Sequence, residues 1–351
     1  MKKISSLILI LVLSIMFTFT GCAAKSQTTS NANEKHKTVT FKDSRGVEVT
    51  VPKNPKRVVV INNSIAEIVY CLGAGDKIVG ISDALKFPEA LVKKQRVGSS
   101  FNPNIEKIIS LKPDIVFGYG QHIKKEMIQK IEASGTKFVA LNGFKINSLD
   151  NDIKTLGEIF DKQEKANEYV AFINKNLNMI KEIVKDIKPE EKVKVYWEEH
   201  SDYKSASKGS GGAEMLDIAG VENIAGKESV AYPQVNKEWI VERNPQVVVK
   251  LGTSKLPLGY EEKDTNGIEK YANKIITRTG WNKIDAVKNK KVYIMSNEIG
   301  TSTRSIVGIC YLAKWCYPDK FKDLNPEKVH KELLEKFYNV KYKGIWTYPN
   351  N

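Results

Sequence analysis

The sequence is poor in the residues that most often hold metal ions or form disulfides. Four of its 351 residues are cysteines and four are histidines, and no Cys-x-x-Cys pair occurs. This pattern excludes a zinc ribbon and a dense disulfide framework. Cys71 and Cys310 lie in apolar, helix-like contexts, which predicts that they are small core residues.

The motifs of common enzyme classes are missing as well. The glycine-rich segment 207–212 lacks the Gly-Lys-Ser/Thr ending of a Walker loop and the Gly-x-Gly-x-x-Gly spacing of a dinucleotide site. No nucleophile elbow and no His-Glu-x-x-His motif occurs. Glu198 and Glu199 are adjacent on a predicted strand and should point to opposite faces, which does not suit a two-carboxylate acid/base site. We therefore expect that the protein is not an enzyme.

Acidic residues are outnumbered by basic ones. The chain has 55 Lys and Arg against 41 Asp and Glu, a formal net charge of +14. Such an excess suits nucleic acid, an anionic surface or an anionic ligand, and composition does not choose among them. With 41% apolar and 27% charged residues the chain is globular, which excludes a fibrous or wholly disordered protein. Its length allows two domains.

Residues 1–21 predict a secretory signal peptide. Lys2 and Lys3 give it a positive start, and residues 7–19 form an apolar core. The apolar stretch is short for a membrane span and is followed at once by polar residues. An uncleaved signal anchor is the alternative.

The end of this segment, Gly21-Cys22, resembles a bacterial lipobox, in which the cysteine is lipidated and becomes the mature N-terminus. Residues 22–37 are rich in Ser, Thr and Asn, which predicts a flexible tether behind lipidated Cys22. We therefore expect an extracytoplasmic domain anchored to the cell membrane, where a nucleic-acid partner is not expected.

Short apolar strands alternate with helical patterns along most of the chain. A hairpin signal over 38–52 comes first. The strands predicted after it lie at 57–61, 78–81, 115–117 and 138–141, and the pattern resumes at residue 193. This alternation predicts an α/β fold with mostly parallel sheets flanked by helices.

Between the two alternating regions, apolar residues recur at steps of three or four over 169–187. This period predicts one long rigid helix, ended by Pro189. We therefore expect an N-terminal lobe over 38–147, a connecting helix within 148–188 and a C-terminal lobe over 189–351.

A duplicated segment relates the two lobes. Residues 104–120 and 236–252 share Asn, Glu, Ile, Pro, Val and a final Gly at one constant offset. Each copy predicts a short helix with an Asn N-cap and a glutamate, Glu106 or Glu238, in its first turn. A proline then ends the helix and a buried strand follows.

Polar and aromatic residues collect at the predicted carboxyl ends of the strands, where open α/β sheets bind ligands. The candidates are Asn63, Tyr119, Gln121 and His122 in the first lobe and Trp197, His200, Tyr203, Tyr232 and Arg304 in the second. If the lobes face each other, these residues line one cleft suited to a large polar ligand with flat or apolar faces. Arg304 suits capture of a carboxylate or another anionic group.

A bare transition-metal site is the main alternative use of this cleft. His122 and His200 could form such a site with Glu198 or Asp202. A bare ion commonly draws three or four protein ligands, so we expect no resident metal and no cofactor.

Five segments carry a resemblance to a known family: residues 41–60, 72–80, 111–116, 219–225 and 281–293. Together they resemble the substrate-binding lipoproteins of ATP-driven iron–siderophore, haem and corrinoid importers, the class III periplasmic binding proteins. The resemblance spans nearly all of the chain after the tether.

The resemblance implies two α/β lobes joined by a single rigid helix, with the ligand held between them. It also implies that one glutamate of each lobe docks onto arginines of a membrane-embedded permease, and Glu106 and Glu238 match those positions. Stabilisation of the helix dipole is the plainer role of these two carboxylates, and both roles can hold together.

We expect a monomeric, tethered receptor that captures a ferric siderophore or related metal–organic complex for an ABC importer. Haem or a corrinoid, with His122 or His200 as axial donor, is one alternative. An oxyanion such as molybdate, bound through Arg304 and loop amides, is another. A tethered enzyme or adhesin on the same fold remains a further possibility, because fold alone does not fix function.

Overall fold

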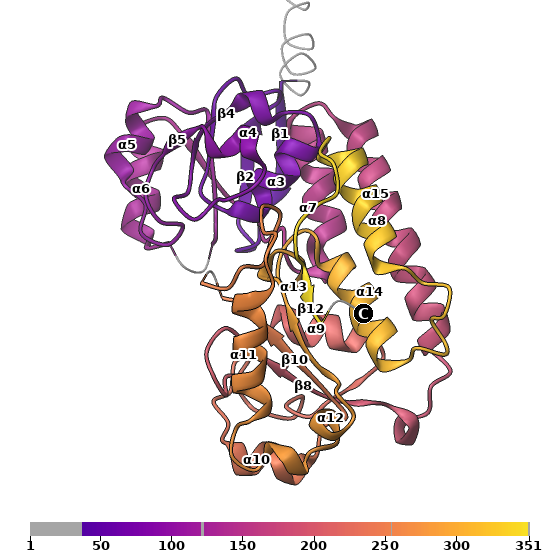
Figure 1. The fold of residues 1–351 in the computed structure, drawn as a ribbon. Coiled ribbons are helices and arrows are strands. Elements are labelled where there is room, and N and C mark those ends of the chain that lie inside the picture. Colours follow the sequence, from indigo (N-terminus) through magenta and orange to yellow (C-terminus); the bar gives the residue numbers. More distant parts are fainter. Residues whose placement is uncertain (1–36, 121–122, 254, 350–351) are drawn as a thin grey trace, which may run out of the picture.

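The computed structural model describes residues 37–120, 123–253 and 255–349 and contains two α/β lobes (Figure 1). The predicted hairpin is present, since β1 (Thr38–Lys42) pairs antiparallel with β2 (Glu48–Pro52). The Asp43 carboxylate accepts a hydrogen bond from the backbone N–H of Ala140 (3.2 Å), which ties the hairpin to the N-terminal lobe. The predicted signal peptide, Cys22 and the predicted tether up to residue 36 lie outside the described residues.

The N-terminal lobe is built on a five-stranded sheet in the order β5-β4-β3-β6-β7, with every pairing parallel. Its strands are β3 (Val58–Val60), β4 (Ile78–Ile81), β5 (Gln95–Arg96), β6 (Ile115–Gly118) and β7 (Lys137–Ala140). Its helices are α3 (Asn63–Cys71), α4 (Glu89–Val92), α5 (Ile105–Ser110) and α6 (Lys125–Ala133). The central strands are buried along their whole length, as parallel strands covered on both faces should be.

The C-terminal lobe repeats this plan, with the strand order β12-β11-β10-β8-β9. Its strands are β8 (Lys194–Glu198), β9 (Glu222–Asn223), β10 (Val247–Leu251), β11 (Val292–Met295) and β12 (Thr347–Tyr348). The edge strand β12 runs antiparallel to β11, and the other pairings are parallel. Its helices are α9 (Gly211–Ile218), α10 (Lys237–Arg243), α11 (Asn266–Ile276), α12 (Asp285–Lys288), α13 (Asn297–Gly300), α14 (Ser305–Cys316) and α15 (Pro326–Phe337).

The prediction of one continuous connecting helix within 148–188 is not confirmed. The connection contains two helices, α7 (Ile146–Ile159) and α8 (Gln163–Val184), which pack against each other. Asp161 adopts the left-handed conformation (φ 56°) between them, which ends the first helix. The periodic stretch lies largely in α8, whose 22 residues make it about 33 Å long.

A helical layer joins the two lobes along one side of the molecule. Helices α7, α8, α14 and α15 lie together on the right in Figure 1 and flank both lobes. One hydrophobic cluster runs through this layer and includes Val58 of the first sheet and Val249 of the second. Because this apolar core is shared, the lobes are held together by more than the chain that connects them.

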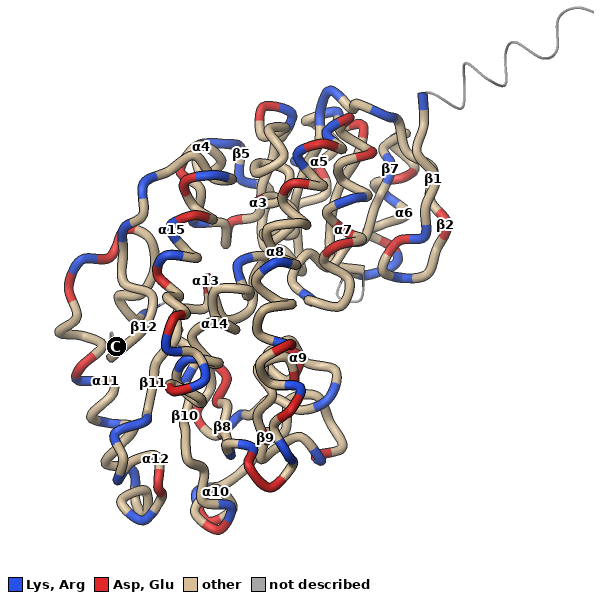
Figure 2. The backbone as a smooth tube through the Cα atoms, turned by 90° about the vertical axis from the view of Figure 1, so that its right-hand side faces the viewer, with Lys and Arg blue, Asp and Glu red and all other residues tan. Residues whose placement is uncertain are grey.

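Basic and acidic residues are interspersed along both lobes (Figure 2). Among the described residues, no helix has both the length and the apolar character needed to span a bilayer.

The duplicated segments fold as predicted. The side chain of Asn104 accepts a hydrogen bond from Lys107 N (2.9 Å) at the start of α5. The side chain of Asn236 does the same for Trp239 N (2.8 Å) at the start of α10. Each segment then leads through a proline into a buried strand, β6 or β10.

Replacing Asn236 with alanine should lower the free energy of unfolding by about 1 kcal/mol, because the N–H of Trp239 loses its acceptor. Urea unfolding followed by circular dichroism measures this loss. Lys107→Ala in the equivalent helix of the other lobe is the control, since it keeps every capping bond and should change stability by about 0.5 kcal/mol or less. Equal stability of Asn236→Ala and the parent protein would show that the cap is dispensable.

Candidate functional site

The carboxyl ends of the strands in the two sheets meet where the lobes touch. Glu67 in α3, which follows β3, lies 3.2 Å from Arg304, which follows β11. A second link joins the backbone N–H of Ile146 to the Glu214 carboxylate (3.1 Å) at the start of α9. The residues that follow the strands of one lobe therefore lie against those of the other, as the two-lobe prediction requires.

A cavity of about 310 Å³ opens at this edge of the C-terminal sheet. Its described lining residues are Glu199, His200, Ser201, Lys204, Tyr232 and Thr301. They come from the segment after β8, from the loop before α10 and from the end of α13. The volume is at the low end of the range for small-molecule sites, about 300–1,000 Å³.

His200 presents one free ring nitrogen at this cavity. Its Nδ1 lies 3.1 Å from the carbonyl oxygen of Gly252. A carbonyl can only accept, so Nδ1 carries a proton and donates it, and in the neutral ring Nε2 keeps its lone pair. Among the described residues Nε2 has no hydrogen-bond partner, and His200 is exposed. The ring can therefore accept a hydrogen bond from a bound molecule or coordinate a metal centre within it.

Glu199 is the buried acidic group of the cavity. One carboxylate oxygen accepts a hydrogen bond from Nε1 of Trp197 (3.0 Å). Burial raises the pKa of Glu199 above its usual value, and the Trp197 hydrogen bond partly opposes that rise. Trp197 itself is fully buried in the core.

Tyr232 and Lys204 form the aromatic and cationic part of the cavity. The ammonium of Lys204 lies 5.7 Å from the centre of the Tyr232 ring, within cation–π range. Tyr232 is 47% exposed, so part of its ring is accessible to a bound molecule. Burial of its inner part raises the pKa of the phenol, which stays protonated and can donate a hydrogen bond at neutral pH.

The N-terminal lobe contributes an aromatic group at its own strand ends. The Tyr119 ring, directly after β6, lies 5.4 Å from Phe101 and 6.2 Å from Phe144, measured between ring centres. Burial raises the pKa of Tyr119 to about 12, and its phenol contacts the backbone of Asn63. The Asn63 Oδ1 atom is buried and has no hydrogen-bond partner in the described part of the chain. Tyr119 and Asn63 thus lie together, as residues after neighbouring strands should.

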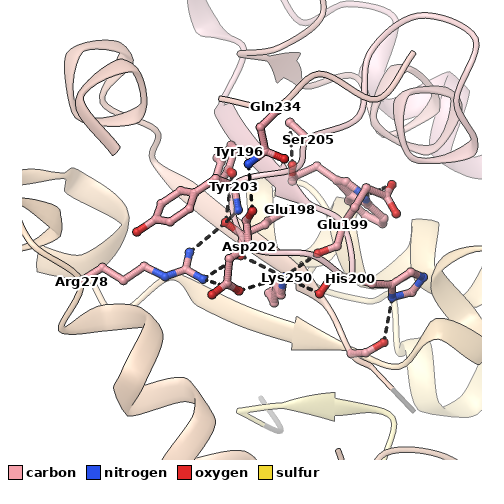
Figure 3. A network of polar contacts seen from close by, with 12 residues as sticks. Tyr196, Glu198, Glu199, His200, Asp202, Tyr203, Ser205, Gln234, Lys250 and Arg278 are labelled. Carbon is pink, nitrogen blue, oxygen red and sulfur yellow. Dashed lines mark hydrogen bonds and ion pairs between the residues drawn. The ribbon is translucent and has the colours of Figure 1, made fainter. Parts of the chain in front are cut away.

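Behind the cavity, four charged side chains form an ion-pair network (Figure 3). Glu198 and Asp202 supply the carboxylates, and Lys250 and Arg278 supply the cations. The ring of Tyr203 packs on the Arg278 guanidinium, 4.7 Å away. Tyr203 therefore supports this network, and it is not among the described residues that line the cavity.

Arg304 was expected to face the cleft, and this expectation is wrong. Its side chain is 1% exposed and is held by Glu67 and Glu298, with rings of Phe87 and Trp346 about it. Two carboxylates pair with the guanidinium inside the protein, and its Nη1 atom has no hydrogen-bond partner among the described residues. Trp197 is likewise enclosed by the core and supports Glu199 from behind.

Only some of the remaining predicted ligand-binding residues lie at the cavity. His200 and Tyr232 lie together at the cavity. Gln121 and His122 lie outside the described residues. Ser201, Lys204 and Thr301 are lining residues that the sequence prediction missed, although they stand close in the chain to His200 or Arg304. No group of three or more His, Cys, Asp or Glu within the described part of the chain is placed to hold a metal ion.

Glu106 and Glu238 occupy equivalent, exposed positions in the first turns of α5 and α10. The Glu238 side chain is 71% exposed and has only a long contact, 3.7 Å, with the ammonium of Lys237. Both carboxylates are therefore accessible to another molecule.

Comparison with known proteins gives consistent matches along the chain. The family described as "Periplasmic binding protein" matches residues 58–299. An uncharacterized ABC transporter substrate-binding lipoprotein of Bacillus subtilis, YvrC, is 30% identical over 85% of this chain and 92% of its own length. The molybdate-binding protein MolA of Haemophilus influenzae is 25% identical over 84% of this chain and 90% of its own length.

Solved structures agree with these sequence matches. The TroA-like periplasmic binding protein FepB of Veillonella parvula has a TM-score of 0.74 at 25% identity and covers 88% of this chain and 99% of its own. MolA bound to molybdate has a TM-score of 0.73 at 24% identity, over 87% of this chain and 99% of its own. With the two-lobe fold and the cavity at the strand ends, these matches place the chain in a family: it belongs to the periplasmic binding proteins, the substrate-binding components of ABC importers.

Proposed function

We propose that this protein is a lipid-anchored receptor that captures a ferric siderophore or related metal–organic complex and delivers it to an ABC permease. The observation that carries the proposal is the free Nε2 of His200 beside Tyr232 and Glu199 in one cavity. Imidazole suits iron as a ligand, and phenol and carboxylate oxygens suit the ferric ion. Binding and release suffice for this role, so no catalytic step is required.

The surroundings of His200 support a chelate over a bare ion. Among its described lining residues the cavity has one exposed histidine and one buried glutamate, which is already bonded to Trp197, and these are fewer donors than a bare-ion site commonly has. A chelator that leaves one or two coordination positions open would supply the missing ligands. Lys204 would balance the negative charge of such a complex, and the Tyr232 ring would pack on its flat face.

An oxyanion is the second candidate, because the hydroxyls of Ser201 and Thr301 stand with Lys204 around a small cavity. These groups could donate hydrogen bonds to molybdate, which the relative MolA binds. The buried Arg304 would not take part. Haem or a corrinoid, with His200 as axial donor, would need more room than the cavity now offers.

The lipid anchor and the docking contacts complete the proposal. Cys22 would carry the lipid, as the lipobox resemblance predicts, and the relative YvrC is described as a lipoprotein. The exposed Glu106 and Glu238 would each bind an arginine of the permease. We expect the protein to dock as a monomer, with one lobe against each half of the permease.

Titration of the purified domain with ferric bis-catecholate should quench its fluorescence and shift the visible charge-transfer band of the iron, since His200 would enter the coordination sphere. His200→Ala should weaken binding about tenfold or more, the equivalent of at least about 1.4 kcal/mol. Glu126→Ala, an exposed glutamate in the first turn of α6, is the control and should bind as the parent does.

The same titration with haemin, cobalamin and molybdate separates the alternatives. A haem-type absorption band with haemin, or tight binding of molybdate without any response to the ferric complex, would replace the proposed cargo. Equal affinity of His200→Ala and the parent for the ferric complex would show that the cavity is not the binding site.

A further inference from the structure

A lysine ammonium is fully buried beside the candidate cavity. Lys250 lies near the end of β10, in the run Val-Val-Val-Lys-Leu, and its side chain is 0% exposed. β10 pairs in parallel with β8 so that Lys250 stands opposite Glu198. Lysine is almost never fully buried unless it is paired, so each of its hydrogens needs an acceptor.

The acceptors of this ammonium point to its role. One is a carboxylate oxygen of Glu198, 3.0 Å away. The other two are main-chain carbonyl oxygens, those of Glu199 (2.5 Å) and His200 (3.2 Å). Two of the three ammonium hydrogens therefore bind the backbone of the two residues whose side chains supply the acid and the imidazole of the cavity (Figure 3).

Charge balance alone does not account for Lys250. The Glu198 carboxylate is already bound by both terminal nitrogens of Arg278, at 2.8 and 3.0 Å. Arg278 also reaches Asp202, at 2.9 Å. Lys250 also lies 3.6 Å from Asp202, so it is the second cation for the second carboxylate. Its two contacts with main-chain carbonyls are shorter than this and are not needed for charge balance, so they are the distinctive contacts of Lys250.

The end of β10 holds His200 at a second point. Gly252, two residues after Lys250, accepts the hydrogen bond from Nδ1 of the His200 ring. In the duplicated segment of the N-terminal lobe, the position equivalent to Lys250 is Gly118, which has no side chain to play this part. The lysine is therefore found in the lobe that carries the cavity and not in its counterpart.

We propose that Lys250 is a positioning residue for ligand binding. It fixes the backbone of Glu199 and His200 so that the imidazole bonds to Gly252 through Nδ1 and presents Nε2 to the cavity. Lys250 does not touch the ligand. The inference rests on the proposed function for the identity of the cargo. The effect of Lys250 on the orientation and tautomer of the His200 ring does not depend on that identity.

The test compares Lys250→Met with Arg278→Met. Both variants remove one cation from the same network, but only Lys250→Met removes the donors to the two carbonyls. Long-range proton–nitrogen NMR spectra of the His200 ring report which nitrogen carries the proton. We expect Lys250→Met to lose the Nδ1-protonated form and Arg278→Met to keep it. Affinity for ferric bis-catecholate should fall about 10- to 100-fold in Lys250→Met, as for other residues that orient a metal ligand.

Two further variants protect the test against a folding defect. Lys250→Gln keeps a neutral donor and should retain part of the affinity. The double variant Lys250→Met with Glu198→Gln also replaces the carboxylate that faced the ammonium by a neutral amide, and it should repeat the loss seen in Lys250→Met. Near-ultraviolet circular dichroism identifies any variant that is not folded.

The outcomes separate the two claims. An unchanged His200 tautomer in a folded Lys250→Met or double variant would overturn the positioning role, whatever the ligand. The parent protein could fail to bind ferric bis-catecholate while the His200 tautomer changes in Lys250→Met and not in Arg278→Met. In that case the proposed cargo is wrong and the positioning role of Lys250 stands. An equal change of tautomer in Arg278→Met would show that the network acts through charge alone, against the inference.

Discussion

Replacing Arg304 with methionine should lower the free energy of unfolding by about 3–5 kcal/mol, the cost of breaking a buried ion pair by removing one partner. The guanidinium joins the lobes, since it lies 3.2 Å from Glu67 in the N-terminal lobe and 3.0 Å from Glu298 in the C-terminal lobe. Without it, Glu67 would remain buried with Tyr338 as its nearest donor, at 2.7 Å. Urea unfolding measures the loss.

The pH dependence of this loss has a definite sign. Burial raises the pKa of Glu67, and the Arg304 charge opposes that rise, so the pKa should climb further in the variant. A carboxyl whose pKa is higher in the folded than in the unfolded protein favours folding more as the pH falls through the folded value. The destabilisation of Arg304→Met should therefore shrink as the solution is made mildly acidic.

Arg243→Met provides the comparison. Arg243 lies at the end of α10, is partly exposed and pairs weakly with Glu242 at 4.0 Å. Its guanidinium also packs on the Trp239 ring, 3.8 Å away, so its replacement should lower stability by about 1 kcal/mol at most. A loss of similar size in both variants would mean that the junction between the lobes does not depend on the buried arginine.

Changing both Glu106 and Glu238 to alanine should leave ligand affinity unchanged and reduce uptake by cells to near background. Each carboxylate would pair with a permease arginine, and the loss of one such buried pair costs about 2 kcal/mol or more, roughly 30-fold in docking affinity. The two losses act together, because the lobes dock at the same time. Uptake of iron from ferric bis-catecholate by cells that express each variant measures the effect.

The matched control changes two other first-turn glutamates, Glu126 of α6 and Glu269 of α11. Both are exposed and lie outside the duplicated segments. This control variant should transport as well as the parent. Normal uptake by the Glu106/Glu238 variant would remove the docking proposal without affecting the binding site.

Much of the fold was predictable because its signals are local. The short apolar run at residues 78–81 predicts β4 with its observed bounds, since a strand buried on both faces is apolar throughout. The duplicated Asn and Pro positions set both ends of α5 and α10. The break between α7 and α8 was missed because Asp161, not a glycine or proline, adopts the left-handed turn.

The site was predictable only in part, because burial of charge depends on contacts far apart in the sequence. Nothing near Arg304 in the chain shows that it will pair with Glu67, so the sequence favours a ligand contact for this arginine among small polar residues. Lys250 shows the opposite case. A lysine in an apolar strand indicates a special partner, and its carbonyl contacts with Glu199 and His200 emerge only when β8 and β10 pair.

Anomalous diffraction at the iron absorption edge, from crystals grown with ferric bis-catecholate, would locate the cargo directly. A single iron peak inside the cavity, within coordination distance of His200 Nε2, is the predicted result. Iron bound on the outer surface of either lobe, with the cavity holding only solvent, would contradict the binding site.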